Sequence, residues 1–190
     1  VLTASGGYGL HLDGASYWTV RGITVTGGQK GIVTDGANGV VLDSVTVHGL
    51  DMEGVHFRKS SKDGVIKNSR IYDTGRDGSG MGEGVYVGSA GGTGDKSDNV
   101  QILHNTIGPG VGGENIDIKE GTTGAKIIGN TFDGSGLTGA TTTTRGPTSR
   151  ATKSWWRATP GSTPVTTGTR RTASSRAGAA ARSSAATGPI

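Results

Sequence analysis

Five short segments of this 190-residue chain share one pattern, and this repeat limits the folds that the chain can adopt. Each segment opens on glycine or asparagine and then alternates apolar and polar positions. The five are GLHLDG from Gly9, GIVTDG from Gly31, GVHFRK from Gly54, GVYVGS from Gly84 and NIDIKE from Asn115. Their starts lie 22, 23, 30 and 31 residues apart, and a second short apolar run follows each one. Each unit is therefore predicted to contain two or three short strands.

A repeat of this length favours a coil of parallel strands over other repeat architectures. A unit of 22 residues is too short for a propeller blade, lacks the helical period of ankyrin arrays, and lacks the leucine framework of leucine-rich repeats. In a coil, each unit forms one turn, stacked on the next at about 4.8 Å. The alternation predicts these inward-facing pairs: Leu10 and Leu12, Ile32 and Thr34, Val55 and Phe57, Val85 and Val87, and Ile116 and Ile118.

Two further features fit the same coil. Asn68, Asn105 and Asn130 fall at similar points of the second runs, with Asp43 one turn earlier, which predicts a ladder of stacked amides. The two longer gaps predict insertions at residues 73–83 and 89–98. Insertions in solenoids gather on one face and often border a binding site.

The repeated segments, the runs NSRIYD, HNTIG and GNTFDG, and the asparagine ladder resemble right-handed parallel β-helix proteins of the pectate-lyase-like superfamily. The resemblance covers residues 9–136 and implies an all-β fold, a right-handed parallel β-helix (solenoid) of about five turns. It also implies a secreted, extracellular protein, although this chain contains no signal peptide. The superfamily includes lyases, hydrolases, adhesins and noncatalytic repeats, so the fold alone does not define an activity.

The repeat stops at about Ala140, which divides the chain into a β-helix of residues 1–140 and a low-complexity basic tail of residues 141–190. The tail holds eight Lys/Arg and no acidic residue, and its composition predicts disorder. Shifting the reading frame back by one base lets residues 156–161 read V-E-G-N-T-G, which predicts a frameshift that removed later turns. A coil truncated there would leave an open C-terminal edge, so we expect a monomer that can aggregate through this edge.

Charge and composition exclude several classes of function. The net charge of +4 comes from the tail, because residues 1–140 hold 11 Lys/Arg against 15 Asp/Glu, so nucleic acid is not the expected partner. The chain has no cysteine, which excludes disulfide scaffolds and thiolate metal sites. No apolar run approaches the roughly 20 residues of a membrane span.

The outward positions of the first strand form two columns of mainly ionisable residues. One column is His11, Val33, His56, Tyr86 and Asp117, and the other is Asp13, Asp35, Arg58, Gly88 and Lys119. Two turns separate Arg58 from Lys119 by about 10 Å, a span that one or two sugar units bridge. Such a face suits an acidic polysaccharide, with His56, Tyr86 and His11 as substrate-binding candidates, because arginine binds carboxylates and tyrosine stacks on sugars.

The resemblance implies a polyuronate lyase acting by β-elimination. Lyases of this superfamily use a lysine or arginine base and calcium held by acidic residues, which makes Lys119 the base candidate and Arg58 the carboxylate partner. The calcium ligand candidates are Asp117, Glu114 and Glu120. Lys119 would need a lowered pKa to act as the base.

Other interpretations remain open at this stage. The ionisable columns also fit a solvated face of a noncatalytic β-helix that serves as a surface or carbohydrate-binding module. The adjacent aspartates and the GHG and RIK motifs of polygalacturonase-like hydrolases are absent. Asp73, Asp77, Ser79 and Glu83 offer oxygens in a glycine-rich segment, as a flexible acidic loop or a calcium loop. The four histidines are predicted to be mostly surface residues.

Overall fold

The computed structural model describes residues 1–91 and 94–136, and every regular element within them is a β-strand. The strands are β1 (Leu2–Thr3), β2 (Tyr8–Asp13), β3 (Thr19–Arg21), β4 (Thr24–Thr26), β5 (Lys30–Asp35), β6 (Val41–Asp43), β7 (Thr46–His48), β8 (Val55–Arg58), β9 (Val65–Lys67), β10 (Arg70–Tyr72), β11 (Val85–Val87), β12 (Gln101–Leu103), β13 (Thr106–Ile107), β14 (Ile116–Ile118), β15 (Lys126–Ile128) and β16 (Thr131–Phe132). The predicted low-complexity tail, its disorder, the frameshift and aggregation through a C-terminal edge all depend on residues outside these ranges.

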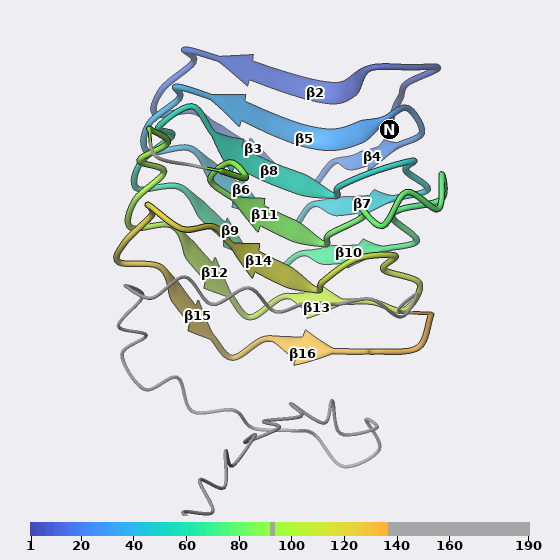
Figure 1. Ribbon diagram of the computed structural model, residues 1–190. Helices are drawn as coiled ribbons and strands as arrows, with labels where there is room; N and C mark the ends of the chain where they lie inside the picture. Colours follow the sequence, from blue (N-terminus) through green and yellow to red (C-terminus); the bar gives the residue numbers. More distant parts are fainter. Residues whose placement is uncertain (92–93, 137–190) are drawn as a thin grey trace, which may run out of the picture.

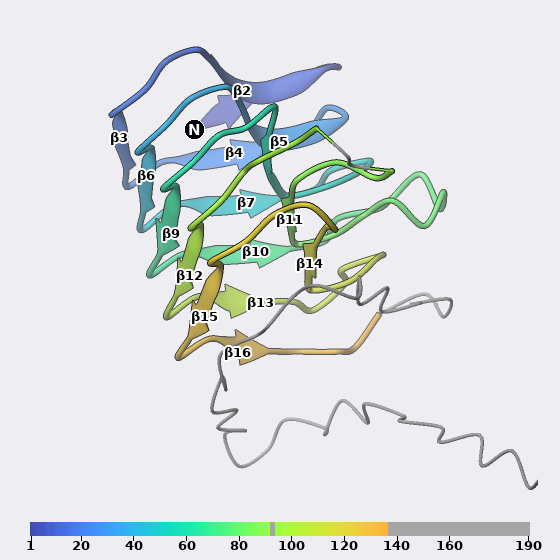
Figure 2. The ribbon, with the colours of Figure 1, turned by 60° about the vertical axis from the view of Figure 1, so that its left-hand side comes forward.

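The strands form three parallel sheets that run along the axis of one coil (Figures 1 and 2). The sheets have the orders β1-β4-β7-β10-β13-β16, β14-β11-β8-β5-β2 and β15-β12-β9-β6-β3. Each turn contributes one strand to each sheet, so the strands from β2 to β16 make five turns. The prediction of an all-β parallel β-helix of about five turns is confirmed.

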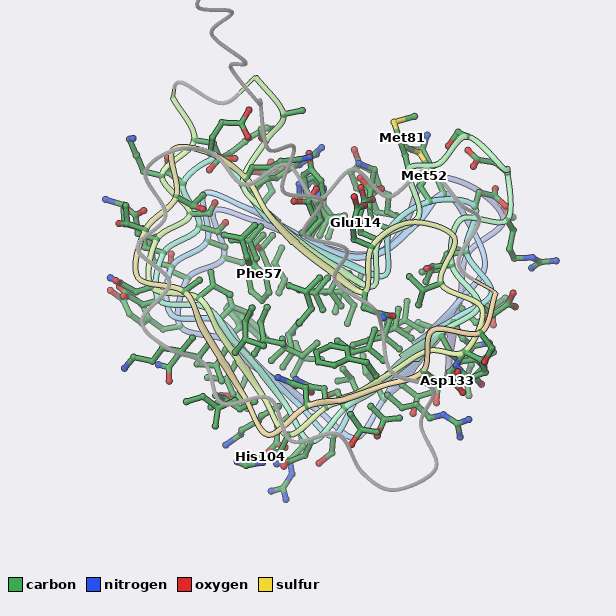
Figure 3. The ribbon with its side chains drawn as sticks, turned by 60° about the horizontal axis from the view of Figure 1, so that its bottom comes forward. Met52, Phe57, Met81, His104, Glu114 and Asp133 are labelled. Carbon is green, nitrogen blue, oxygen red and sulfur yellow. The ribbon has the colours of Figure 1, made fainter. Side chains whose placement is uncertain are left out.

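The inward-facing side chains pack in layers along the axis of the coil. Pairing aligns Ile32 with Val55 and Thr34 with Phe57, and the alignment continues through Val85 and Val87. Phe57 is fully buried and points into the interior of the coil (Figure 3). All the inward positions predicted from the sequence are buried or packed against the core, which confirms the assignment of the two faces.

The amide ladder exists at Asn105 and Asn130, but the predicted alignment is wrong by one position for Asn68 and by two for Asp43, which pairs with Lys67. The strand register places Asn105 opposite Ser69 on one neighbouring turn and opposite Asn130 on the other. Asn68 lies opposite His104 instead. Within the ladder, the N–H of Ser69 donates to Oδ1 of Asn105, and the N–H of Asn105 donates to Oδ1 of Asn130, both at 2.9 Å. Asn68 stands one residue earlier with φ of 52°, a left-handed conformation that asparagine tolerates.

Glycine at the start of the first strand lets successive turns stack closely. A Cβ on Gly54 would lie 2.6 Å from the carbonyl oxygen of Gly84 on the next turn. The residues before two of these glycines, Glu53 and Glu83, stand at the same position of successive turns, and both are buried.

Both predicted insertions are present as loops between strands. The first connects β10 to β11, and the second connects β11 to β12, so both flank the same strand of one sheet. Among the described residues, no helix is long and apolar enough to cross a membrane.

Candidate active site

The outward residues of the sheet β14-β11-β8-β5-β2 form the two columns that the sequence predicts. Pairing joins His11 to Val33, then Val33 to His56, then His56 to Tyr86, and finally Tyr86 to Asp117. The second column follows the same register, one turn after another, through Asp13, Asp35, Arg58, Gly88 and Lys119. Exposure differs along the first column, because Val33, His56 and Tyr86 are buried.

Tyr86 and Lys119 meet at the β14 end of this face. Nζ of Lys119 lies 5.0 Å from the centroid of the Tyr86 ring on the neighbouring turn. Gly88 permits this approach, because a Cβ there would lie 3.2 Å from Cβ of Lys119 and 2.8 Å from Cγ2 of Thr122. Burial raises the pKa of Tyr86 to about 12, so the phenol keeps its proton at neutral pH.

Asp117 controls the charge of Lys119. Nζ of Lys119 lies 2.6 Å from Oδ2 of Asp117, and the two side chains are 17% and 11% exposed. Burial alone would lower the pKa of Lys119, but the hydrogen bond and the charge of Asp117 outweigh burial and raise it above its usual range. A base needs the neutral amine, so the resting protein has the opposite of the lowered pKa that the base role requires. Lys119 can become a base only when Asp117 takes another partner.

Three carboxylates gather beside this pair. Glu83, Glu114 and Asp117 each offer one oxygen, and these oxygens all lie within 4.8 Å of one another. Glu83 is 6% exposed, and its Oε2 has no hydrogen-bond partner among the described residues. Burial, together with the charges of Glu53, Glu114 and Asp117, raises the pKa of Glu83 to about 7. A cation among these oxygens would relieve their repulsion and give the unpaired oxygen a partner, and carboxylate oxygens are the ligands that calcium prefers.

This group differs in part from the predicted calcium ligands. Glu114 and Asp117 belong to it, whereas Glu120 does not. The first insertion contributes Glu83 alone, because Asp77 accepts hydrogen bonds from the N–H and hydroxyl of Ser79 at 2.9 and 2.8 Å instead. The insertion therefore completes a site on the coil rather than forming a calcium loop of its own.

His56 contacts Tyr86 from the neighbouring turn of the same outer face. It is 5% exposed, and its ring meets the Tyr86 ring edge-on with centroids 4.4 Å apart. Its Nε2 lies 2.9 Å from the carbonyl oxygen of Gly88, and its Nδ1 lies 3.5 Å from Nζ of Lys30. Burial lowers the pKa of His56 to about 4, so the imidazole is neutral at pH 7. The prediction of a surface histidine is wrong for His56, because both ring nitrogens face other groups of the protein.

A buried ion pair lies next to His56. Nζ of Lys30 donates to Oε1 of Glu53 at 3.0 Å, and both residues are buried. Register places Lys30, Glu53, Glu83 and Glu114 at the same position of four successive turns. The lysine compensates the first of the three stacked glutamates, so the excess negative charge falls on Glu83 and Glu114.

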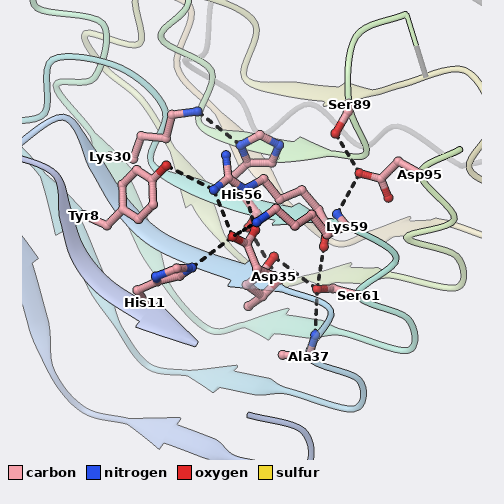
Figure 4. Close-up of polar contacts among 12 residues, drawn as sticks. Tyr8, His11, Lys30, Asp35, Ala37, His56, Lys59, Ser61, Ser89 and Asp95 are labelled. Carbon is pink, nitrogen blue, oxygen red and sulfur yellow. Dashed lines mark hydrogen bonds and ion pairs between the residues drawn. The ribbon is translucent and has the colours of Figure 1, made fainter. Parts of the chain in front are cut away.

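Arg58 is separated from Lys119, because β11 lies between β8 and β14 in the sheet. Its guanidinium binds the carboxylate of Asp35, with Nε donating to Oδ1 and Nη2 donating to Oδ2, the second at 3.0 Å. This hydrogen bonding to Asp35 raises the pKa of Arg58 above its usual range. His11 reaches the same carboxylate with its Nε2 3.0 Å from Oδ2 (Figure 4). Arg58 therefore lies two turns from Lys119, and its guanidinium is already paired with Asp35.

Sequence reasoning missed Glu83 as a site residue on the coil, and it missed Lys30, Glu53 and the role of Asp35. The first three stand just before or at the start of a strand, outside the alternating pattern that defines the two columns. Their signal was present in the repeat, since Glu53, Glu83 and Glu114 each precede the first residue of a repeated segment.

Together, the stacked turns and their outer face define a β-solenoid with a buried tyrosine, a lysine and an acidic group on one sheet. The chain belongs to the right-handed β-helix family, whose description as a right handed beta helix region matches residues 2–153. This match also confirms the resemblance on which the expected fold rests.

A solved structure described as the alginate lyase from Paenibacillus sp. str. FPU-7 is similar to this chain, with a TM-score of 0.67 and 46% sequence identity. The match covers 71% of this chain and 46% of that chain, so this chain spans less than half the length of that protein. The comparison with curated proteins found no match.

Proposed function

We propose that this protein binds an acidic polysaccharide along the sheet β14-β11-β8-β5-β2 and cleaves it by β-elimination at Tyr86 and Lys119. The observation that carries this proposal is the contact of a protonated phenol and an amine beside three convergent carboxylates. The similarity to an alginate lyase supports a polyuronate substrate, and alginate is the first candidate. The same similarity supports an extracellular location, where such polysaccharides occur.

The two side chains divide the proton transfers of an elimination. Lys119, as the neutral amine, takes the proton from C5 of the uronate, and the C5–H electrons form the C4–C5 double bond. The C4–O bond breaks, and the hydroxyl of Tyr86 donates its proton to the departing glycosidic oxygen. Transfer from Lys119 back to Tyr86 restores both groups, which their contact on adjacent turns permits. With its pKa raised, Tyr86 carries the proton that it would donate.

Calcium fits the group formed by Glu83, Glu114 and Asp117. Bound there, calcium would supply positive charge that neutralises the uronate carboxylate and draws Asp117 away from Lys119. Asp117 is the residue that raises the pKa of Lys119, so its engagement elsewhere favours the neutral amine.

The calcium site can be tested without an activity assay. Calcium in excess should raise the melting temperature of the wild-type protein relative to the same protein in a chelator. Glu83→Gln should abolish this shift, and Glu120→Gln should leave it intact. A calcium shift that survives Glu83→Gln would remove the group as the site.

Elimination is tested by incubating the protein with alginate, polygalacturonate and glycosaminoglycans, with and without calcium, and recording the absorbance of unsaturated products. Lys119→Ala and Tyr86→Phe should each lower the rate at least about 100-fold with the fold retained. Lys126→Ala and Tyr17→Phe alter exposed residues of the same types and should leave it unchanged. Binding without product in the folded wild type would instead support a noncatalytic carbohydrate-binding module.

A further inference from the structure

The backbone ladder of the sheet β14-β11-β8-β5-β2 is interrupted at Gly88, directly after β11. On the two preceding turns, the N–H that follows the strand donates to a carbonyl of the next turn, from Gly14 to Asp35 at 2.8 Å and from Gly36 to Arg58 at 3.2 Å. The same register would join the N–H of Lys59 to the carbonyl of Gly88. Each of these two groups instead binds a side chain.

His56 binds the carbonyl that the ladder leaves. Its Nε2 lies 2.9 Å from the carbonyl oxygen of Gly88, and a carbonyl only accepts, so Nε2 carries the proton of the neutral imidazole. Nδ1 is then an acceptor, and Nζ of Lys30, which only donates, lies 3.5 Å from it (Figure 4). The carboxylate of Glu53 holds this ammonium at 3.0 Å. The two neighbours of the ring therefore select one tautomer.

Asp95, on the second insertion, binds the other half of the missing rung. It is 8% exposed, and its carboxylate accepts the N–H groups of Lys59 and Ser60, each at 2.9 Å (Figure 4). Its Oδ2 also accepts the hydroxyl of Ser89, the residue after Gly88, at 2.7 Å. Backbone groups left without partners are costly, so the interruption persists because side chains satisfy both of them.

The interruption bears on the candidate site because Lys119 packs on Gly88. Gly88 has φ of 90°, a conformation that residues with a side chain rarely adopt, and a Cβ there would lie 3.2 Å from Cβ of Lys119. The N–H of Lys119 donates to the carbonyl of Val87 at 2.9 Å. His56 also contacts the ring of Tyr86, with centroids 4.4 Å apart. One buried imidazole therefore contacts Tyr86 and holds the peptide on which Lys119 packs.

We propose that His56 is a positioning residue, whose Nε2–H tautomer holds the carbonyl of Gly88 outside the ladder and thereby keeps Lys119 against Tyr86. His56 is 5% exposed, so it acts through these neighbours. Its effect on cleavage rests on the proposed function, whereas its effect on the backbone does not. Asp95 has the supporting part, because it binds the N–H that the carbonyl of Gly88 leaves.

The tautomer is tested on the wild-type protein by nitrogen NMR of the histidine side chains at pH 7, with His56→Gln to assign the signals. Nε2 of His56 should be protonated, and Nδ1 should not. A ring that carries its proton on Nδ1, alone or together with Nε2, would overturn the proposal.

The effect on the backbone is measured as amide hydrogen exchange by NMR, relative to the N–H of Thr46 on another sheet. His56→Leu removes the donor to Gly88, so the N–H of Lys119 should exchange about tenfold faster, as the loss of one hydrogen bond allows. His56→Gln keeps a side-chain N–H donor and should restore most of the protection. His104→Leu changes an exposed histidine and should leave the exchange of Lys119 as in wild type.

Kinetics distinguish positioning from a purely structural role. His56→Leu should lower kcat about tenfold with little change in KM, and His56→Gln should restore most of kcat. An unchanged kcat in His56→Leu would overturn the proposal, and so would exchange that accelerates equally at Lys119 and Thr46. Failure of the proposed function has a different signature, namely no unsaturated product from the wild-type protein. In that case the tautomer and the exchange of Lys119 still decide whether His56 holds this part of the backbone.

Discussion

Environment sets the charge of the residues on the outer face more than residue type does. Lys119 is held charged by Asp117, His56 is neutral because it is buried, and Glu83 retains a proton to about pH 7. Perturbed pKa values of this kind gather at functional sites. A sequence shows the residue types of such a site, whereas the sign of each pKa shift depends on burial and on the charged groups that the folded coil brings close.

The opposite shifts of His56 and Glu83 predict how stability varies with pH. Between pH 6.5 and 4 the unfolded chain protonates at His56 before the folded protein does, so falling pH destabilises the fold. Between pH 7 and 4.5 the folded protein protonates at Glu83 first, so falling pH stabilises it. His56→Gln should therefore gain stability relative to wild type as pH falls through this range, and Glu83→Gln should lose it, each by up to about 3 kcal/mol.

The measurement is the free energy of unfolding by urea at several pH values between 7 and 4.5. His104→Gln, which changes an exposed histidine, is the control and should follow the wild-type curve. If the free energy of unfolding changed equally with pH in wild type, His56→Gln and Glu83→Gln, neither residue would titrate as the structure indicates.

At the scale of the strand and turn, the sequence predicted which residues face inward but not the position of every turn. The alternation in GVHFRK and GVYVGS defines the two faces, because a strand places successive side chains on opposite sides. The predicted amide ladder was displaced by one residue at Asn68. Ser44, Asn68 and His104 stand at the same position of three turns and share a left-handed conformation, which their residue types alone do not predict. Glu53 was missed, and Glu83 was assigned to a loop and not to the coil, because both precede the glycine at which the repeat was recognised.

The corrected ladder predicts a large difference between two asparagines. Asn105 is 1% exposed, its Oδ1 accepts the N–H of Ser69, and its Nδ2 donates to the carbonyl of Ile66 at 3.1 Å. Asn105→Ala leaves these buried groups without partners and should cost about 2–4 kcal/mol. Asn68→Gly relieves a left-handed conformation at an exposed site and should change stability by less than about 1 kcal/mol.

Urea titration of both variants measures this difference, with far-ultraviolet circular dichroism to verify the fold. Equal losses of stability in Asn105→Ala and Asn68→Gly would mean that the ladder follows the sequence alignment and not the register of the structure.

At the scale of the whole molecule, stacking of the turns brings together side chains that no single repeat contains. Tyr86, Lys119 and the Glu83 group come from adjacent turns, and Asp35 lies further along the same sheet with Arg58 and His11. One continuous face therefore carries both groups of side chains.

The masses of the products test whether Tyr86 and Lys119 catalyse an elimination. A uronate oligomer of defined length, incubated with the wild-type protein, should give one fragment with a double bond and one saturated fragment, whose masses together equal that of the substrate. Lys119→Ala and Tyr86→Phe should leave the oligomer intact. Two saturated fragments that together weigh one water more than the substrate, or an intact oligomer with the folded wild-type protein, would contradict the account.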